Sequence, residues 1–218
     1  MTDGVAVTPP LLAAVFASGS GTNFQALFDH QSAASSWRIT LLFSDRESAG
    51  ALGRARVSGV ETAVVPVKDR SPEDVSRDTL EVLRAHDVDV LLLSGYLRLL
   101  PLAVISRFRR RILNIHPALL PEFGGKGMYG MNVHRAVVEA GVPMTGATVH
   151  YADEEYDTGP IIAQWPVPVR PGDNAEDVAA RVLEVEHLLY PVAVDHVCDA
   201  LVAGRDPESF DPLSADSS

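Results

Sequence analysis

Short apolar runs alternate with longer amphipathic stretches along this 218-residue chain. Their apolarity is continuous rather than alternating, which is typical of strands covered on both faces. The runs lie at residues 11–16, 39–43, 62–67, 88–94, 112–115, 147–151 and 160–167. The pattern predicts an α/β fold with a mostly parallel, Rossmann-like, doubly wound sheet of about seven strands and flanking helices.

Two of the amphipathic stretches carry helix-start signals. Ser71 is placed to cap a helix whose first position is Pro72, and acidic residues fill its first turn. Asn174 is placed to cap a second helix that ends at Gly204, and Pro191 predicts a kink or interruption within it. Helices of this kind pack on the faces of a sheet and leave the carboxyl ends of its strands open for ligands.

The chain has no internal repeat and no low-complexity linker. With 46% hydrophobic residues, it predicts a single packed domain over residues 1–204, followed by a flexible C-terminal tail at 205–218. The apolar segment at 11–19 has some signal-peptide character, but it has only about the length of one strand. No apolar stretch approaches the roughly 20 residues of a membrane-spanning helix, so no membrane partner is expected.

The charge and the cysteine content limit the kinds of binding partner and the cellular compartment that we expect. The net charge is -11, from 29 acidic and 18 basic residues, which argues against a broad nucleic-acid surface but leaves room for a local anion pocket. Cys198 is the single cysteine, so no intramolecular disulfide or thiolate cluster is possible. We expect Cys198 to be a small core residue and the protein to be cytoplasmic. Its oligomeric state, monomer or homodimer, is left open.

A glycine-containing loop, "ASGSGTNFQAL" at 17–27, follows the first predicted strand and opens a helix. Gly19 and Gly21 can bring backbone N–H groups close to an anion at the helix N-terminus. A dinucleotide site is the alternative, because Asp45 follows the second strand where a ribose-binding acid would sit. Phe24 stands where the dinucleotide pattern has a small residue, which favours a monophosphate; a tight turn without a ligand is the third reading.

"RILNIHPALLPEF", at 111–123, ends an apolar run on two polar side chains. Asn114 and His116 share one side of a strand because strand side chains repeat every two residues. An amide N–H can stabilise a developing oxyanion, and an imidazole can transfer a proton near neutral pH. The pair therefore suggests acyl-type transfer, although a structural histidine and a capping asparagine explain the two residues equally well when they are taken alone.

"EEYDTGPII", at 154–162, places Asp157 in a loop before another apolar strand. Its carboxylate could approach the His116 imidazole and favour the charged form, or it could serve an ordinary turn. Four glycines between the two motifs, in "GGKGMYGMN" at 124–132, predict a mobile loop beside the site. Lys126 within this loop either contacts an anionic ligand or is simply solvated.

Two other mechanistic classes find little support in the sequence. The seven histidines show no metal-ligand spacing and there is no H-E-x-x-H motif, so no metal site is predicted. There is no G-x-S-x-G elbow, and no base lies near Cys198 in sequence, so covalent catalysis has no obvious nucleophile. Direct transfer between two bound substrates is favoured. A nucleotide-binding oxidoreductase and a non-catalytic metabolite-binding domain remain as alternatives.

The combination of "SGSGTN", "NIHPALLP", "TGATVHY" and "DTGPII" closely resembles the phosphoribosylglycinamide formyltransferase family, the folate-dependent enzymes of purine synthesis. The resemblance runs through roughly residues 11–204. It implies the formyltransferase fold and direct transfer of formyl from 10-formyltetrahydrofolate to the amine of glycinamide ribonucleotide, with no metal. Two relatives with similar catalytic motifs, methionyl-tRNA formyltransferase and formyltetrahydrofolate deformylase, carry additional domains for which we expect no room here.

The resemblance also assigns site residues. It implies that Asn114, His116 and Asp157 form the catalytic trio, with His116 as proton donor and Asp157 raising its pKa. The ribonucleotide site it implies comprises Gly19, Ser20, Gly21, Thr22, Asn23 and Glu186. The folate site it implies comprises Arg70, Leu97, Arg98, Leu99, Leu100, Asn114, Asp153, Glu154, Glu155, Tyr156 and Asp157.

Some of these assignments rest on the resemblance alone. The residue pattern alone predicts that Glu186 is a solvated charge on a helix. It predicts that the leucines near 97–100 are ordinary core residues. The family has an arginine near its folate and phosphate region, and the corresponding position in this chain falls between Arg70 and Pro72. The glycine-rich loop at 124–132 is longer than in many members of the family.

Overall fold

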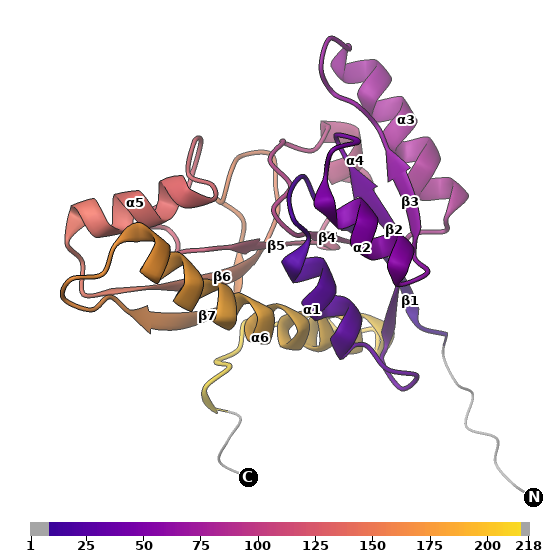
Figure 1. The fold of residues 1–218 in the computed structure, drawn as a ribbon. Helices are drawn as coiled ribbons and strands as arrows, with labels where there is room; N and C mark the ends of the chain where they lie inside the picture. Colours follow the sequence, from indigo (N-terminus) through magenta and orange to yellow (C-terminus); the bar gives the residue numbers. More distant parts are fainter. Residues whose placement is uncertain (1–8, 215–218) are drawn as a thin grey trace, which may run out of the picture.

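A seven-stranded sheet forms the centre of the computed structural model, which describes residues 9–214 (Figure 1). The strand order is β3-β2-β1-β4-β5-β6-β7. Strands β3 to β5 are parallel in that order, and β6 and β7 run antiparallel to their neighbours. The predicted mostly parallel, doubly wound sheet is confirmed.

The predicted strands all form, with small shifts at their ends. The strands are β1 Leu11–Phe16, β2 Trp37–Ser44, β3 Glu61–Val64, β4 Val90–Leu93, β5 Ile112–His116, β6 Met144–Tyr151 and β7 Ile161–Pro168. The helices are α1 Thr22–His30, α2 Gly50–Val57, α3 Pro72–Ala85, α4 Leu102–Arg107, α5 Met131–Ala140 and α6 Ala175–Val202. Within residues 9–214, none of these helices is long and apolar enough to cross a membrane.

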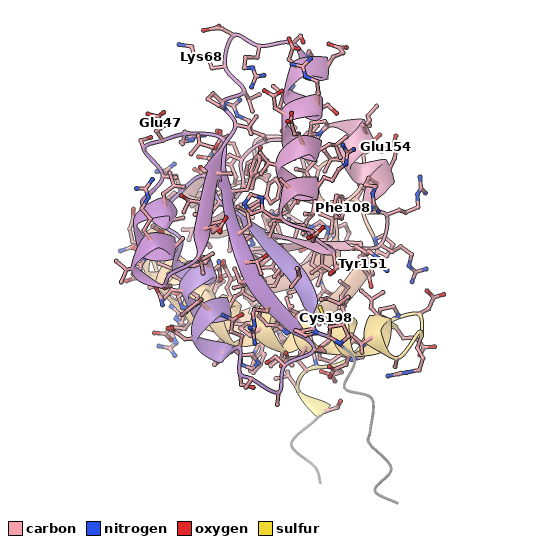
Figure 2. All side chains as sticks on the ribbon, turned by 90° about the vertical axis from the view of Figure 1, so that its right-hand side faces the viewer. Glu47, Lys68, Phe108, Tyr151, Glu154 and Cys198 are labelled. Carbon is pink, nitrogen blue, oxygen red and sulfur yellow. The ribbon has the colours of Figure 1, made fainter. Side chains whose placement is uncertain are left out.

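Helices cover both faces of the sheet and divide the core in two. One buried cluster joins the sheet to α1, α2, α5 and α6, and the other joins it to α3 and α4. Figure 2 faces the β3 edge, with α6 along one side of the sheet and α3 near the other. Cys198 lies in α6 and is fully buried, as expected of a small core residue.

The predicted helix caps are present, but Pro191 does not interrupt its helix. The Ser71 side chain accepts from the Asp74 N–H, and Asn174 forms a reciprocal capping box with Asp177. Helix α6 continues through Pro191 for 28 residues. Proline removes one backbone hydrogen bond, and Pro191 is buried with several of its neighbours in α6, which offsets that loss.

The segment predicted to be a tail makes contacts in its described part. The N–H of Phe210 donates to the carbonyl of Ile162, and its ring stacks on His196 at 4.4 Å between centroids. These contacts attach residues 205–214 to β7 and α6. Residues 215–218 lie outside the described residues, and the single-domain assignment stays a prediction.

The chain order of the strands creates a topological switch point between β1 and β4. The chain proceeds outward from β1 to β3 and then returns to the other side of β1 with β4. In such sheets the loops after the two strands diverge and leave a crevice at their carboxyl ends. Tyr190 of α6 supports this edge, because its hydroxyl lies 3.1 Å from the Leu93 carbonyl and 3.0 Å from the Leu113 carbonyl.

Candidate active site

One cavity of about 750 Å³ opens at this switch point. The loops after β1, β4 and β5 line it, together with the glycine-rich loop before α5, the loop between β6 and β7, and one face of α6. Its size falls in the range of small-molecule sites. The motifs singled out in the sequence therefore meet in one place.

The glycine loop after β1 forms one wall of the cavity. Gly19, Ser20, Gly21, Thr22 and Asn23 all line it. Helix α1 begins at Thr22, so the first N–H groups of the helix, which have no acceptor within it, lie at this wall. This is the arrangement expected of a phosphate site.

Any residue other than glycine would be strained at position 21. The φ of Gly21 is +78°, and an added Cβ would lie 2.6 Å from both Cα and Cβ of Ala51. The N–H of Ala51 in turn donates to the Gly19 carbonyl, so α2 is held tightly against the loop. The close approach of α2 thus requires glycine at 21.

Gly21→Ala is expected to lower the free energy of unfolding by at least about 2 kcal/mol, because it combines a left-handed backbone with overpacking against Ala51. It should also weaken binding of a phosphate-bearing substrate. Urea denaturation and the KM for that substrate measure the two effects. Gly19→Ala is the matched control for stability, since nothing lies within 4 Å of its added Cβ; equal destabilisation by both variants would contradict the steric argument.

Asn23 and Glu186 join the glycine loop to α6. Nδ2 of Asn23 donates to Oε2 of Glu186 at 2.6 Å, and both residues are at least nine-tenths buried. The Asn23 amide nitrogen is thus directed at Glu186 of α6, another residue that the resemblance places in the ribonucleotide site. Burial raises the pKa of Glu186 from its ordinary value near 4.5 to about 7, opposed by the hydrogen bond from Asn23. Glu186 is therefore a cavity residue and not a solvated helical charge.

The raised pKa of Glu186 predicts a stability that falls as pH rises from about 4.5 to about 7, because the folded state then holds a proton that the unfolded state has released. The shift of about 2.5 pH units corresponds to roughly 3 kcal/mol. Glu186→Gln keeps an acceptor for Asn23 and removes this cost, so the variant should be the more stable protein at pH 8. Urea unfolding of both proteins at pH 5 and pH 8 checks the expectation, and an identical pH dependence would refute it.

The predicted catalytic trio comes together at the end of β5. Asn114 and His116 lie on the same face of β5, and Asp157 reaches them from the β6–β7 loop. Oδ2 of Asp157 lies 3.5 Å from Nδ1 of His116 and accepts from the N–H of Gly125 at 2.9 Å. Nε2 of His116 donates to the Phe123 carbonyl at 2.9 Å. Both nitrogens of the imidazole therefore face acceptors, which suits a ring that can take up a second proton.

Burial and charge act in opposite directions on His116. Burial lowers the pKa of His116, while the Asp157 charge and the Phe123 carbonyl raise it; the net direction is downward. Asp157 thus has the predicted sign of effect, but burial outweighs it. The pKa of Asp157 itself is lowered: burial opposes this, and the nearby His150 and His116 rings together with the Gly125 N–H outweigh burial.

Two residues beside His116 have left-handed backbones although they are not glycine. Phe123 has φ +55° and Asp157 has φ +59°. Phe123 presents its carbonyl and Asp157 its carboxylate to the same imidazole. Such conformations cost of order 1 kcal/mol or more and concentrate at functional sites, so their occurrence on both sides of His116 supports a functional role for this ring.

The residues predicted to contact folate separate into two groups. Leu97, Arg98, Leu99 and Leu100 after β4, and Asp153, Glu155, Tyr156 and Asp157 after β6, line the cavity. Glu154 and Arg70 are not among its lining residues; Arg70 pairs with Asp78 at 2.5 Å. Contact of any of these residues with folate stays a prediction.

Asp45, the basis of the dinucleotide alternative, is not placed to bind a ribose. Its carboxylate forms a two-point contact with Arg46 at 3.0 and 2.8 Å and lies 3.4 Å from Nε of Arg98. Asp45 does not line the cavity, whereas Arg98 does. The carboxylate is therefore engaged in holding arginines, which removes the main support for a dinucleotide site.

Two histidines of the cavity, His150 and His134, were given no role from the sequence, and Lys126, for which the sequence allowed two roles, lines the cavity as well. His150 lies directly opposite Asn114 across the β5–β6 pair, His134 enters from the first turns of α5, and Lys126 lies in the glycine-rich loop. Burial lowers the pKa of His134 to about 4, so it is a neutral ring at pH 7. The motif "TGATVHY" contained His150, but its partner depends on the register of antiparallel strands, which spacing does not reveal. Among residues 9–214, no group of three His, Cys, Asp or Glu side chains is arranged to hold a metal ion.

Comparison with known proteins shows the family to which this chain belongs. Residues 12–194 match the family model described as formyl transferase. The chain belongs to the formyl transferase family. Phosphoribosylglycinamide formyltransferase of Escherichia coli is 35% identical over 187 residues, which cover 85% of this chain and 86% of that protein. The chain therefore groups with the phosphoribosylglycinamide formyltransferases within the family, and the predicted resemblance is confirmed.

Two further formyl transferases extend the comparison. Chloroplastic phosphoribosylglycinamide formyltransferase of Vigna unguiculata is 43% identical over 194 residues; the match covers 88% of this chain and 62% of that protein. The crystal structure of glycinamide ribonucleotide transformylase 1 from Symbiobacterium toebii superposes with a TM-score of 0.81 at 38% identity, covering 88% of this chain and 89% of that one. The formyltransferase fold predicted from the sequence is thus confirmed.

Proposed function

We propose that this protein transfers the formyl group of 10-formyltetrahydrofolate to the amine of 5'-phosphoribosylglycinamide, a step of purine biosynthesis. The observation that carries the proposal is the single cavity at the β1–β4 switch point, which holds a phosphate-type loop and the trio Asn114, His116 and Asp157 together. Membership of the formyl transferase family supports the same reaction class. Both substrates are small molecules, and the location of the protein in the cytoplasm is part of the proposal.

The two substrates occupy different walls of the cavity in this proposal. The ribonucleotide phosphate binds the N–H groups at the start of α1, and Glu186 accepts from its ribose hydroxyls. The folate lies against the apolar side chains after β4 and the loop after β6. Arg98 and Lys126 are the arginine and lysine side chains of the cavity lining, and either can meet the anionic groups of these substrates.

The transfer step forms one bond and breaks another at the formyl carbon. The unprotonated amine of the ribonucleotide attacks that carbon, a C–N bond forms, and the formyl oxygen becomes an oxyanion. Nδ2 of Asn114 and the imidazolium of His116 donate to this oxygen. The bond from the formyl carbon to N10 of the folate then breaks, N10 gains a proton, and the amine nitrogen loses one. Asp157 stabilises the charged form of His116 throughout.

The Phe123 carbonyl competes with the substrate in this scheme. Nε2 of His116 already donates to it at 2.9 Å. For His116 to donate to the formyl oxygen from Nε2, this bond must break or be shared. Phe123 stands at the start of the glycine-rich segment, whose backbone can absorb the required shift.

A spectroscopic assay of deformylation of 10-formyltetrahydrofolate tests the proposal. The signal should depend on 5'-phosphoribosylglycinamide, and the dephosphorylated substrate should show a much higher KM because the N–H groups at the start of α1 have lost their anion. Formate release in the absence of the amine would indicate hydrolysis instead. The absence of a signal when both substrates are present would reject formyl transfer.

A further inference from the structure

His150 is a buried side chain of β6 that the proposed reaction does not yet use. It is 1% exposed and its Cα pairs directly with that of Asn114 in the antiparallel β5–β6 ladder. Directly opposite residues in such a ladder bring their side chains into contact. Nε2 of His150 lies 2.9 Å from Nδ2 of Asn114. His150 is therefore the hydrogen-bond partner of the Asn114 amide.

The second ring nitrogen determines which tautomer His150 has. Nδ1 lies 2.8 Å from the backbone carbonyl of Tyr151. A carbonyl can only accept, so Nδ1 must carry a proton. In the neutral ring Nε2 then has no proton and can only accept. The structure places the Asn114 NH₂, a donor, against this nitrogen, which is the partner that such a ring can accept from.

We infer that His150 is a positioning residue that fixes the orientation of the Asn114 amide, so that its NH₂ serves the oxyanion. An amide nitrogen has two N–H bonds, and His150 occupies one of them. The other is left to donate into the cavity, where the proposed reaction develops negative charge. Were the amide reversed, it would present its oxygen to the developing oxyanion and repel it. This inference rests on the proposed function.

Asp157 makes this role of His150 necessary. Oδ1 of Asp157 lies 3.6 Å from Nε2 of His150, on the same side as the Asn114 amide. Without the His150 acceptor, the Asn114 NH₂ can turn to the Asp157 carboxylate, since both groups approach the same nitrogen of His150. The carboxylate would then be bonded to Asn114 and would compensate the charge of His116 less well. His150 thus keeps the Asn114 amide away from the Asp157 carboxylate, which remains free to compensate the charge of His116.

Two variants separate positioning from packing. His150→Leu keeps the apolar volume and removes the acceptor. In His150→Gln the amide nitrogen can donate to Asp157, which leaves Oε1 to accept from Asn114. We expect kcat to fall at least about tenfold in His150→Leu, with KM for both substrates within about threefold of wild type, because one donor of the oxyanion site loses its orientation. His150→Gln should recover kcat to within about threefold of wild type.

Several results would overturn the inference. Wild-type kcat in His150→Leu would do so, as would equal loss of kcat in both variants with equal loss of thermal stability, which would indicate packing alone. Nitrogen-15 NMR of the wild-type protein gives a readout that does not need activity: a protonated Nδ1 and a bare Nε2 at His150 are expected, and the reverse tautomer would contradict the argument. An inactive wild type rejects the proposed function, while the NMR result still decides the geometry.

Discussion

His116→Ala should lower kcat by about 10² to 10³-fold and leave the KM for the ribonucleotide within about threefold of wild type. The imidazole combines oxyanion stabilisation with proton transfer, each worth about a hundredfold or more. The ring contacts Phe123 and Asp157 and not the glycine loop after β1, so phosphate binding should be unaffected. Steady-state kinetics of formyl transfer measure both parameters.

A histidine outside the cavity provides the control for this variant. His86 bonds to the Val82 carbonyl and to Glu61 and does not line the cavity, so His86→Ala should keep the wild-type kcat. If His116→Ala also keeps it, the assignment of His116 as the proton donor is wrong. A loss confined to KM would instead make His116 a binding residue.

Asp157→Asn should lower kcat by about a hundredfold and shift the pKa of His116 further downward. The carboxylate favours the imidazolium against the effect of burial, so removing its charge leaves burial less opposed. With a lower pKa, the protonated fraction of His116 falls at every pH, and the loss of rate on raising the pH should begin at lower pH. Asparagine tolerates the left-handed backbone at this position, so the fold should persist.

NMR titration of the His116 ring and the pH profile of kcat test this expectation together. Glu155→Gln is the matched control, because Glu155 lies in the same loop and lines the cavity but has no ion pair with His116 among the described residues. The His116 pKa should be unchanged in that control. An unchanged pKa in Asp157→Asn would remove the proposed role of the carboxylate.

Local patterns predicted the parts of the fold that depend on local physics. Continuous apolar runs identify strands buried on both faces, and Ser71 and Asn174 are visible helix caps because their side chains act within one turn. The two-residue spacing of Asn114 and His116 already implied a shared strand face. The predicted interruption at Pro191 does not occur, since local propensity cannot weigh one lost hydrogen bond against the packing of a whole helix.

The rest of the site depends on contacts between distant segments. Glu186 looks like any charged residue on an amphipathic helix until Asn23 of the glycine loop is placed beside it. His150 acquires its partner only through the β5–β6 register, and a one-residue slip would turn it away. Arg70 is engaged by Asp78, a contact that no local pattern indicates.

The bond between Asn23 and Glu186 also bears on how the protein is made. The two residues are 163 positions apart, and Tyr190, which braces the ends of β4 and β5, is close to Glu186 in sequence. Synthesis proceeds from the N-terminus, and contacts of such long range form late in folding. A nascent chain that has completed β1 through β5 would therefore carry the glycine loop, Asn114 and His116 without a finished ribonucleotide site until α6 leaves the ribosome.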